Sequence, residues 1–244
     1  MPAPGHLPDD ALLLAVGDVH GRLDLLAPLL DALQDLAAGL TDRSRATLVM
    51  LGDYVDRGRD SAGVVERLAD GAWSAVTPVF LGGNHEDFML QFLDEPLAAL
   101  NWLPCGGFAC LESYGVPPPR LFDIDGALEA SAALKRALPP AHRRFLRGLA
   151  LSHRQGDYFL CHAGVRPDVP LDAQSAKDLR WIRWPFLKHE GAHEAVIVHG
   201  HTPVAEAELL PARINLDTGA YSSGRLTGAL LREDRCKLVT ASLA

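Results

Sequence analysis

The stretch Gly52-Asp53-Tyr54-Val55-Asp56-Arg57-Gly58 directly follows an apolar run from Thr47 to Leu51. The run is typical of a buried strand in a parallel sheet, and ligands bind beyond the carboxyl ends of such strands. The two oxygens of Asp53 could each serve one cation. Arg57 could hold a phosphate through forked, charge-assisted hydrogen bonds. Taken alone, the stretch fits a polar surface turn equally well.

Four other apolar segments also end in polar residues beside glycine. The residues that follow them are Asp18 and His20, Asn84 and His85, His162, and His199 with His201. Each group has a simple structural explanation, as a turn former, a surface histidine or a core histidine. Five such groups at equivalent strand ends are difficult to explain as independent coincidences, so one shared site is the favoured interpretation.

The order of apolar segments predicts the fold. Strands are expected at 12–16, 47–51 and 76–81, alternating with helices at 24–38, 61–69 and 87–93. This alternation indicates βαβ units. Further short strands are expected at 150–154, 158–161, 195–198, 213–216, 225–231 and 237–240. They predict a second sheet, and hence an α/β fold in which two mixed β-sheets pack as a central sandwich flanked by helices.

Proline-rich sequence at 94–148 interrupts this order and contains two helical segments, at 128–138 and 143–149. We interpret it as a partly helical cap inserted into a single domain of residues 1–244. Such a cap would lie over the mouth of the site and could select substrates. The first dozen residues are also rich in proline and are expected to be loose.

Composition excludes several classes of protein. The formal net charge is -8, which argues against stable binding to nucleic acid or to an anionic membrane surface. The chain has no basic, apolar leader and no run near the roughly 18 apolar residues of a membrane span. Its four cysteines form no CxxC pair and no disulfide framework. A cytoplasmic location without membrane attachment is therefore the expectation.

The donor types at the strand ends suit one chemistry. Oxygen and imidazole ligands without thiolate favour Mn²⁺, Fe or Zn²⁺. Two such ions about 3.5–4 Å apart can orient a phosphate and lower the pKa of a bridging water. That arrangement needs one shared carboxylate and several ligands on each side, which the five strand ends supply.

The motifs themselves resemble a known family. GDxHG, GDxVDRG, GNHE, HAG and GHTP occur in that order at 17–21, 52–58, 83–86, 162–164 and 200–203. Their order is similar to that of the phosphoprotein phosphatase branch of the calcineurin-like metallophosphoesterases. The small bacterial and phage Ser/Thr phosphatases and the symmetrical diadenosine tetraphosphatases look most similar. The family usually carries Lys or Arg where this chain has Gly82, which puts in doubt any electrostatic help from that position.

The resemblance implies two metal ions, with Mn²⁺ favoured and Fe or Zn as alternatives. Its implied ligands are Asp18 and His20 for the first ion, Asp53 as the bridge, and Asn84, His162 and His201 for the second. Of the two histidines around Gly200, the family's ligand is the one before Thr-Pro. His199 is therefore expected to have a structural or supporting role.

The resemblance also implies a mechanism, in which a metal-bound hydroxide attacks phosphorus directly and no phosphoenzyme forms. His85 would protonate the leaving oxygen, and Asp56 would orient His85. Arg57 would bind phosphate oxygens, together with Arg183 from the segment 179–186. Two further assignments stay open: Arg180 could take the place of Arg183, and Tyr221, in the loop 214–224, could contact substrate or simply pack there.

Three functions are compared. The favoured one is hydrolysis of phosphoserine or phosphothreonine in proteins, with phosphotyrosine as a further substrate. The alternative is a symmetrical dinucleoside polyphosphate hydrolase or a nucleotide-cap hydrolase, since arginines in the cap could bind a longer anion. A catalytically inactive binding module would lack at least one ligand or the acid, and none of these residues is missing.

Overall fold

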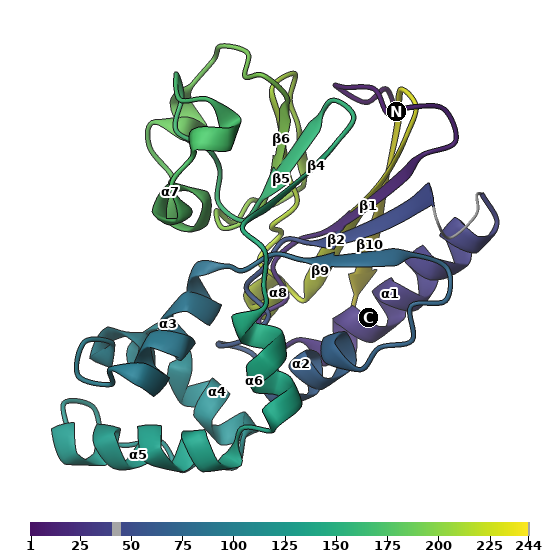
Figure 1. Cartoon of the computed structure of the whole chain (residues 1–244). Coiled ribbons are helices and arrows are strands. Elements are labelled where there is room, and N and C mark those ends of the chain that lie inside the picture. Colours follow the sequence, from purple (N-terminus) through teal and green to yellow (C-terminus); the bar gives the residue numbers. More distant parts are fainter. Residues whose placement is uncertain (41–44, 244) are drawn as a thin grey trace.

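The protein is described by a computed structural model, in which residues 1–40 and 45–243 are placed (Figure 1). Two five-stranded sheets form its centre. The first has the order β10 (Arg235–Ser242), β9 (Arg225–Arg232), β1 (Leu12–Val16), β2 (Ala46–Met50) and β3 (Thr77–Phe80). The second has the order β4 (Ser152–Gln155), β5 (Tyr158–Cys161), β6 (Val196–His199), β8 (Arg213–Asn215) and β7 (Glu208–Leu209).

Strand β1 shows why the two sheets stack. All five of its residues are buried, which is typical of a strand covered on both faces. Leu12, Leu14 and Val16 belong to the hydrophobic cluster that includes the helices, whereas Leu13 and Ala15 belong to the cluster between the sheets. Successive side chains of a strand point to opposite faces, so one apolar run serves both layers. The predicted sandwich of two mixed sheets with flanking helices is confirmed.

The parallel part of the first sheet is built from βαβ units. Strand β1 pairs in parallel with β2, and β2 with β3. The connections run through α1 (Leu23–Ala38) and α2 (Ser61–Ala69), close to the expected bounds. On the other side of β1, β9 and then β10 pair antiparallel. The sheet is therefore mixed, and its parallel strands end at the same edge.

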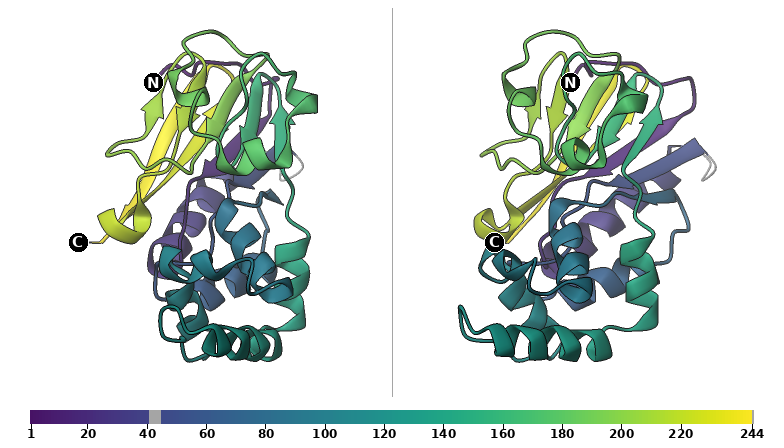
Figure 2. Two further views of the ribbon diagram at one scale, coloured as in Figure 1. Left: turned by 90° about the vertical axis from the view of Figure 1, so that its left-hand side faces the viewer. Right: turned by 60° about the vertical axis from the view of Figure 1, so that its left-hand side comes forward.

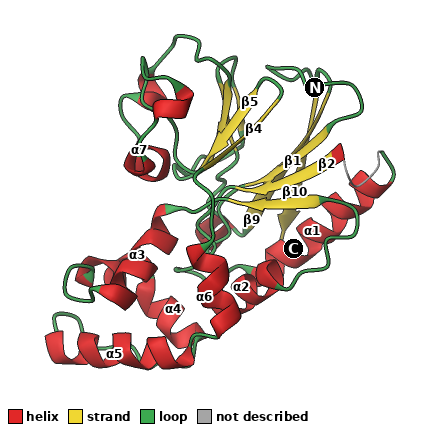
Figure 3. Cartoon of the chain, in the orientation of Figure 1, coloured by secondary structure: helices red, strands yellow, loops and turns green. Residues whose placement is uncertain are grey.

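Helices α1 and α2 lie along the outer face of the first sheet (Figures 1 and 3). A second helical group lies farther from the strands and contains α3 (Asn84–Asp94), the 3-10 segment η2 (Leu100–Cys105), α4 (Gly107–Ser113), α5 (Ile124–Ala137) and α6 (Pro140–Arg147). Both views in Figure 2 show these elements grouped below the sheets. Smaller elements lie beyond the second sheet or between strands: η3 (Leu171–Ala173), α7 (Ala176–Trp181), η4 (Phe186–Lys188) and α8 (Ala220–Ser223).

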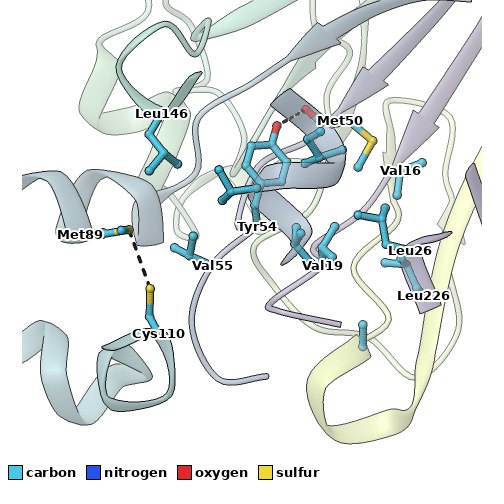
Figure 4. Close-up of a cluster of buried hydrophobic side chains, with 14 of the residues drawn as sticks. Val16, Val19, Leu26, Met50, Tyr54, Val55, Met89, Cys110, Leu146 and Leu226 are labelled. Carbon is cyan, nitrogen blue, oxygen red and sulfur yellow. Dashed lines mark hydrogen bonds between the residues drawn. The ribbon is translucent and has the colours of Figure 1, made fainter. Parts of the chain in front are cut away.

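The segment predicted as a cap shares the core of the first sheet. Leu111, Leu134 and Leu146 belong to the same buried cluster as the strand residues. Figure 4 shows Met89 and Cys110 beside Val55 and Leu146, in one continuous apolar region. Its helices α5 and α6 begin earlier than expected, since Asp123 caps α5 and Pro140 opens α6.

The expectation that the first dozen residues are loose is wrong. Leu7 is fully buried in the cluster between the sheets. The backbone N–H of Ala3 donates to the carbonyl of Asp234, and the Met1 ammonium donates to the carbonyl of Cys236. This segment therefore pairs with the start of β10 and the turn before it, at the edge of the first sheet.

Candidate active site

The ends of β1, β2, β5 and β6 and the first turn of α3 bring the predicted site residues together. The prediction had α3 begin at 87, but it begins at Asn84, so two site residues occupy its first turn. The gathered side chains are at most 7% exposed: Asp18, His20, Asp53, Asp56, Asn84, His85, His162 and His201. Burial of so many polar groups is costly unless they bind one another or a ligand.

The backbone at these turns takes conformations that L-residues rarely adopt. His20, Asp53, Asp56, Arg57 and His201 all have positive φ, between 47° and 75°. Such strain is typical of functional sites whose surroundings fix the backbone. Glycine allows the neighbouring chains to approach, since a Cβ on Gly83 would lie 2.1 Å from Asp53 Oδ1.

Asp53 lies at the centre of the site. Its Oδ2 is 3.4 Å from Nε2 of His20, and its Oδ1 is 3.4 Å from Nε2 of His162. Two groups of possible metal ligands share this carboxylate among the described residues, one with His20 and His85 and the other with His162 and His201. The geometry is consistent with a dinuclear metal site in which Asp53 bridges, and it leaves the identity of the metal open.

The remaining predicted ligands lie around these groups. Asn84 Oδ1 is 3.0 Å from Nε2 of His162. Asp18 accepts hydrogen bonds from the backbone N–H of His201 at 3.0 and 3.2 Å, and it is in neither of the two groups. Burial, and then the neighbouring Asp217 and Asp53, raise the pKa of Asp18 well above its ordinary value. Crowded buried carboxylates favour a proton or a cation among them, so this donor set fits metal binding.

The imidazoles are held in the form that binds metals. Burial lowers the pKa of His20 to about 3 and that of His201 to about 3. Both rings are therefore neutral near pH 7, as ligands must be. The Nδ1 of His20 contacts the carbonyl of Val55 at 2.9 Å, and that of His162 contacts the carbonyl of Leu51 at 2.9 Å. These contacts direct the Nε2 atoms toward Asp53.

His199, in contrast, is in neither group of possible ligands. It is fully buried, and its ring packs edge-on against Phe186 with centroids 5.0 Å apart. This environment is that of a core histidine.

His85 and Asp56 form a closely coupled pair. His85 Nδ1 is 2.6 Å from Asp56 Oδ2, and the Nε2 of the same ring is 3.9 Å from Asp53 Oδ2. Burial alone would lower the pKa of His85, but Asp53 and Asp56 outweigh it and raise the pKa. A histidine oriented by one carboxylate and biased toward its protonated form is suited to donate a proton.

Trp102 is a contact that the sequence did not indicate. Its indole N–H donates to Asp56 Oδ2 at 2.7 Å, the same oxygen that His85 contacts. The other oxygen, Oδ1, is buried and has no hydrogen-bond partner among the residues that the structure describes. The backbone N–H of Arg57 donates to the carbonyl of Gly106 nearby. Residues of η2 and its C-cap thus hold the loop that carries Asp56 and Arg57. In the sequence, this contact is indicated only by the stretch Trp102-Leu103-Pro104-Cys105-Gly106-Gly107.

Glu86 holds the backbone of the loop after β2, which carries Asp53. Its carboxylate accepts hydrogen bonds from the backbone N–H groups of Asp53, Tyr54, Val55 and Gly83, at 2.7 to 3.2 Å. Burial and the charge of Asp53 raise the pKa of Glu86 to about 7, and the N–H donors oppose this rise. The place of Glu86 in the GNHE motif is the sequence signal that could have found this role.

Three arginines border the site. Arg57 contacts Nε2 of His20 and Nε2 of His85, each at 3.1 Å. The exposed Arg183 reaches the carbonyl of His201 at 3.5 Å. Arg180 forms an ion pair with Asp87 at 2.8 Å and lies above Gly82, where a Cβ would be 3.6 Å from its guanidinium. A cation is therefore present beside Gly82, although the family's basic residue is missing from that position.

Buried carboxylates and imidazoles that share Asp53, with arginines at the rim, fit a metal-dependent phosphoesterase. The chain belongs to the calcineurin-like phosphoesterase family, whose match covers residues 11–239. No helix among the described residues is long and apolar enough to cross a membrane.

Curated relatives match this chain along most of its length. Bis(5'-nucleosyl)-tetraphosphatase PrpE [asymmetrical] of Bacillus cereus (strain B4264) is 24% identical, with 93% of this chain and 94% of the relative covered. The protein of the same name from Bacillus velezensis is 25% identical over 93% and 92%. These relatives match over almost their full lengths.

Solved structures share the fold. A crystal structure described as a candidate diadenosine tetraphosphatase has a TM-score of 0.66 at 21% identity, covering 98% of this chain and 100% of the other. The cold-active protein-tyrosine phosphatase of a Shewanella species has a TM-score of 0.58 at 19% identity, covering 99% and 84%. At these identities the structures support the fold, and the site supports the chemistry.

Proposed function

We propose that the protein hydrolyses dinucleoside polyphosphates such as diadenosine tetraphosphate, with asymmetrical cleavage. The observation that supports the proposal is the cluster of possible metal ligands that share Asp53, in a chain that matches bis(5'-nucleosyl)-tetraphosphatases along nearly its whole length. The protein phosphatase function that the sequence motifs favoured, on phosphoserine or phosphothreonine, stays a prediction. The assay below compares it directly with dinucleotide hydrolysis.

In this proposal two metal ions are held by the residues assigned from the motifs. Asp18, His20 and Asp53 would hold one, and Asp53 with Asn84, His162 and His201 would hold the other. When bound, the ions would neutralise phosphate charge and lower the pKa of a water. The short contacts around Asp53 support its bridging role.

The chain's own residues would supply binding and proton transfer. Arg57 would hold phosphate oxygens, since its two terminal nitrogens already reach the histidines on either side. His85, oriented by Asp56, would give a proton to the leaving oxygen. Arg183 is favoured over Arg180 as the second phosphate ligand, because Arg180 is engaged by Asp87.

The test is an assay of the purified protein with added Mn²⁺ on diadenosine tetraphosphate, a phosphothreonine peptide and p-nitrophenyl phosphate. We expect the dinucleotide to have the highest kcat/KM and to give ATP and AMP. Two molecules of ADP would indicate symmetrical cleavage. Activity on the peptide without activity on the dinucleotide would contradict the proposal and support the phosphatase prediction.

A further inference from the structure

A cavity of about 770 Å³ adjoins the candidate active site. Its volume is within the range of roughly 300–1,000 Å³ that small-ligand sites occupy. The turn after β1, the turn before α2, α8 and the C-terminal segment surround it. The residues that line it include Gly21, Arg22, Asp24, Arg57, Gly58, Arg59, Asp60, Tyr221 and Leu243.

Two lining residues join the cavity to the reactive centre. Arg57 contacts His20 and His85, and its guanidinium lies 4.6 Å from the centre of the Tyr221 ring. The Tyr221 ring in turn meets His20 edge-on, with centroids 5.4 Å apart. A molecule in the cavity would therefore extend from the side of the site where His20 and His85 lie.

The charges in the cavity favour an anion. Arg22 is already paired, since it binds Asp24 at 2.7 and 2.8 Å. Asp60 is also engaged, because its carboxylate caps α2. Arg57 contacts His20, His85 and Tyr221, and neither Arg57 nor Arg59 forms an ion pair with a carboxylate among residues 1–40 and 45–243. Both guanidinium groups therefore have charge available for phosphate oxygens.

Tyr221 and Leu243 give the cavity an apolar, partly exposed part of its lining. The side chain of Tyr221 is 39% exposed, and that of Leu243 is 59% exposed. An aromatic ring beside an aliphatic side chain offers a surface on which a nucleobase can pack. Cationic and apolar groups that line one cavity match the phosphates and the base of a nucleotide.

We propose that this cavity binds the leaving half of the substrate, a nucleoside polyphosphate, with its phosphates on Arg57 and Arg59 and its base beside Tyr221. The inference rests on the proposed function. In the reaction, the oxygen of water bonds to phosphorus as the P–O bond to the leaving phosphate breaks, and the leaving oxygen receives a proton. That oxygen departs next to His85, which places the leaving group on the cavity side.

The test uses ATP, one of the products, as an inhibitor of p-nitrophenyl phosphate hydrolysis. Arg59→Ala should weaken inhibition by ATP about fivefold, the effect of one exposed charge pair. Inhibition by inorganic phosphate and the KM for p-nitrophenyl phosphate should stay within about twofold. The matched control is Arg154→Ala, since Arg154 is an exposed arginine on β4 of the other sheet. Metal chelation by ATP is the same for every variant and cancels in the ratio.

Several outcomes would overturn the assignment. If Arg59→Ala weakens inhibition by ATP and by inorganic phosphate equally, or changes neither, Arg59 is not part of the ATP-binding site. If inorganic triphosphate inhibits the unchanged protein as strongly as ATP, the base contributes nothing to binding and does not pack on Tyr221. If the unchanged protein fails to cleave the dinucleotide but ATP still binds through Arg59, the proposed substrate is wrong and the nucleotide cavity stands.

Discussion

The substitution Trp102→Phe tests whether η2, through Asp56, orients the proposed general acid His85. It removes one N–H and keeps an aromatic ring in a fully buried position. The lost bond is the 2.7 Å contact to Asp56 Oδ2, an oxygen that otherwise meets only His85. Because Oδ1 has no partner, Asp56 would retain a single side-chain donor.

The loss of this one hydrogen bond sets the expected effects of Trp102→Phe on stability and on kcat. A hydrogen bond to a charged group contributes about 1.5–3 kcal/mol, so the free energy of unfolding should fall by about 2 kcal/mol. Asp56 would then hold His85 less firmly. Because complete general-acid catalysis contributes about 10²–10⁴-fold, partial loss of orientation should lower kcat about tenfold when the leaving group needs protonation.

The assay compares two phosphomonoesters that differ in leaving group, p-nitrophenyl phosphate and an alkyl phosphate. The good leaving group departs without help, so its kcat should fall less than about threefold, while KM stays unchanged for both. In the proton NMR spectrum, the His85 Nδ1–H resonance should shift. Trp73→Phe, outside the site and packed against Phe80, is the control.

An equal fall in kcat for both leaving groups would refute this reasoning. So would a loss of stability with an unchanged His85 resonance. In either case Trp102 would act by packing alone.

Three further predictions concern other parts of the molecule. Asp53→Asn should lower the bound Mn²⁺ measured by mass spectrometry of metals, and should lower kcat/KM at least about a hundredfold, whereas unchanged metal content would remove the bridge. His199→Gln should reduce the loss of stability on acidification. Burial lowers the pKa of His199 from 6.5 to about 3, so the unfolded chain binds the extra proton and stability falls as pH drops below 6.5. Urea unfolding at pH 5 and pH 8 should show about 2 kcal/mol less pH dependence in the variant, and an equal dependence would contradict the shift. Leu7→Ala should destabilise the protein by about 2–5 kcal/mol, whereas a change below about 0.5 kcal/mol would show that the N-terminal segment does not pack.

Local sequence determined the framework of the site. The apolar runs before Gly17 and Gly52 predicted strands, because a strand buried on both faces has few residue types available to it. The run before Gly82 predicted a strand as well, although β3 is only partly buried. Polar residues directly after such strands must lie at one edge of the sheet. Asp53 could therefore be placed at the centre before any contact was known.

Contacts between distant segments could not be read in this way. Trp102 is 46 positions from Asp56, and nothing in its neighbours indicates which buried carboxylate its N–H would meet. The N-terminal segment looked loose because proline and polar residues surround Leu7, yet burial of one leucine and backbone pairing with β10 hold it. Both are long-range effects, which depend on how the layers pack.

The sequence by itself determined the class of chemistry, since ligand type and strand-end position are local properties. Only the tertiary structure placed Arg59, Tyr221 and Leu243 around one cavity beside His20 and His85. Two separate turns, α8 and the C-terminal segment form that cavity. Their relative positions follow from the packing of helices on the sheet, which no local pattern encodes.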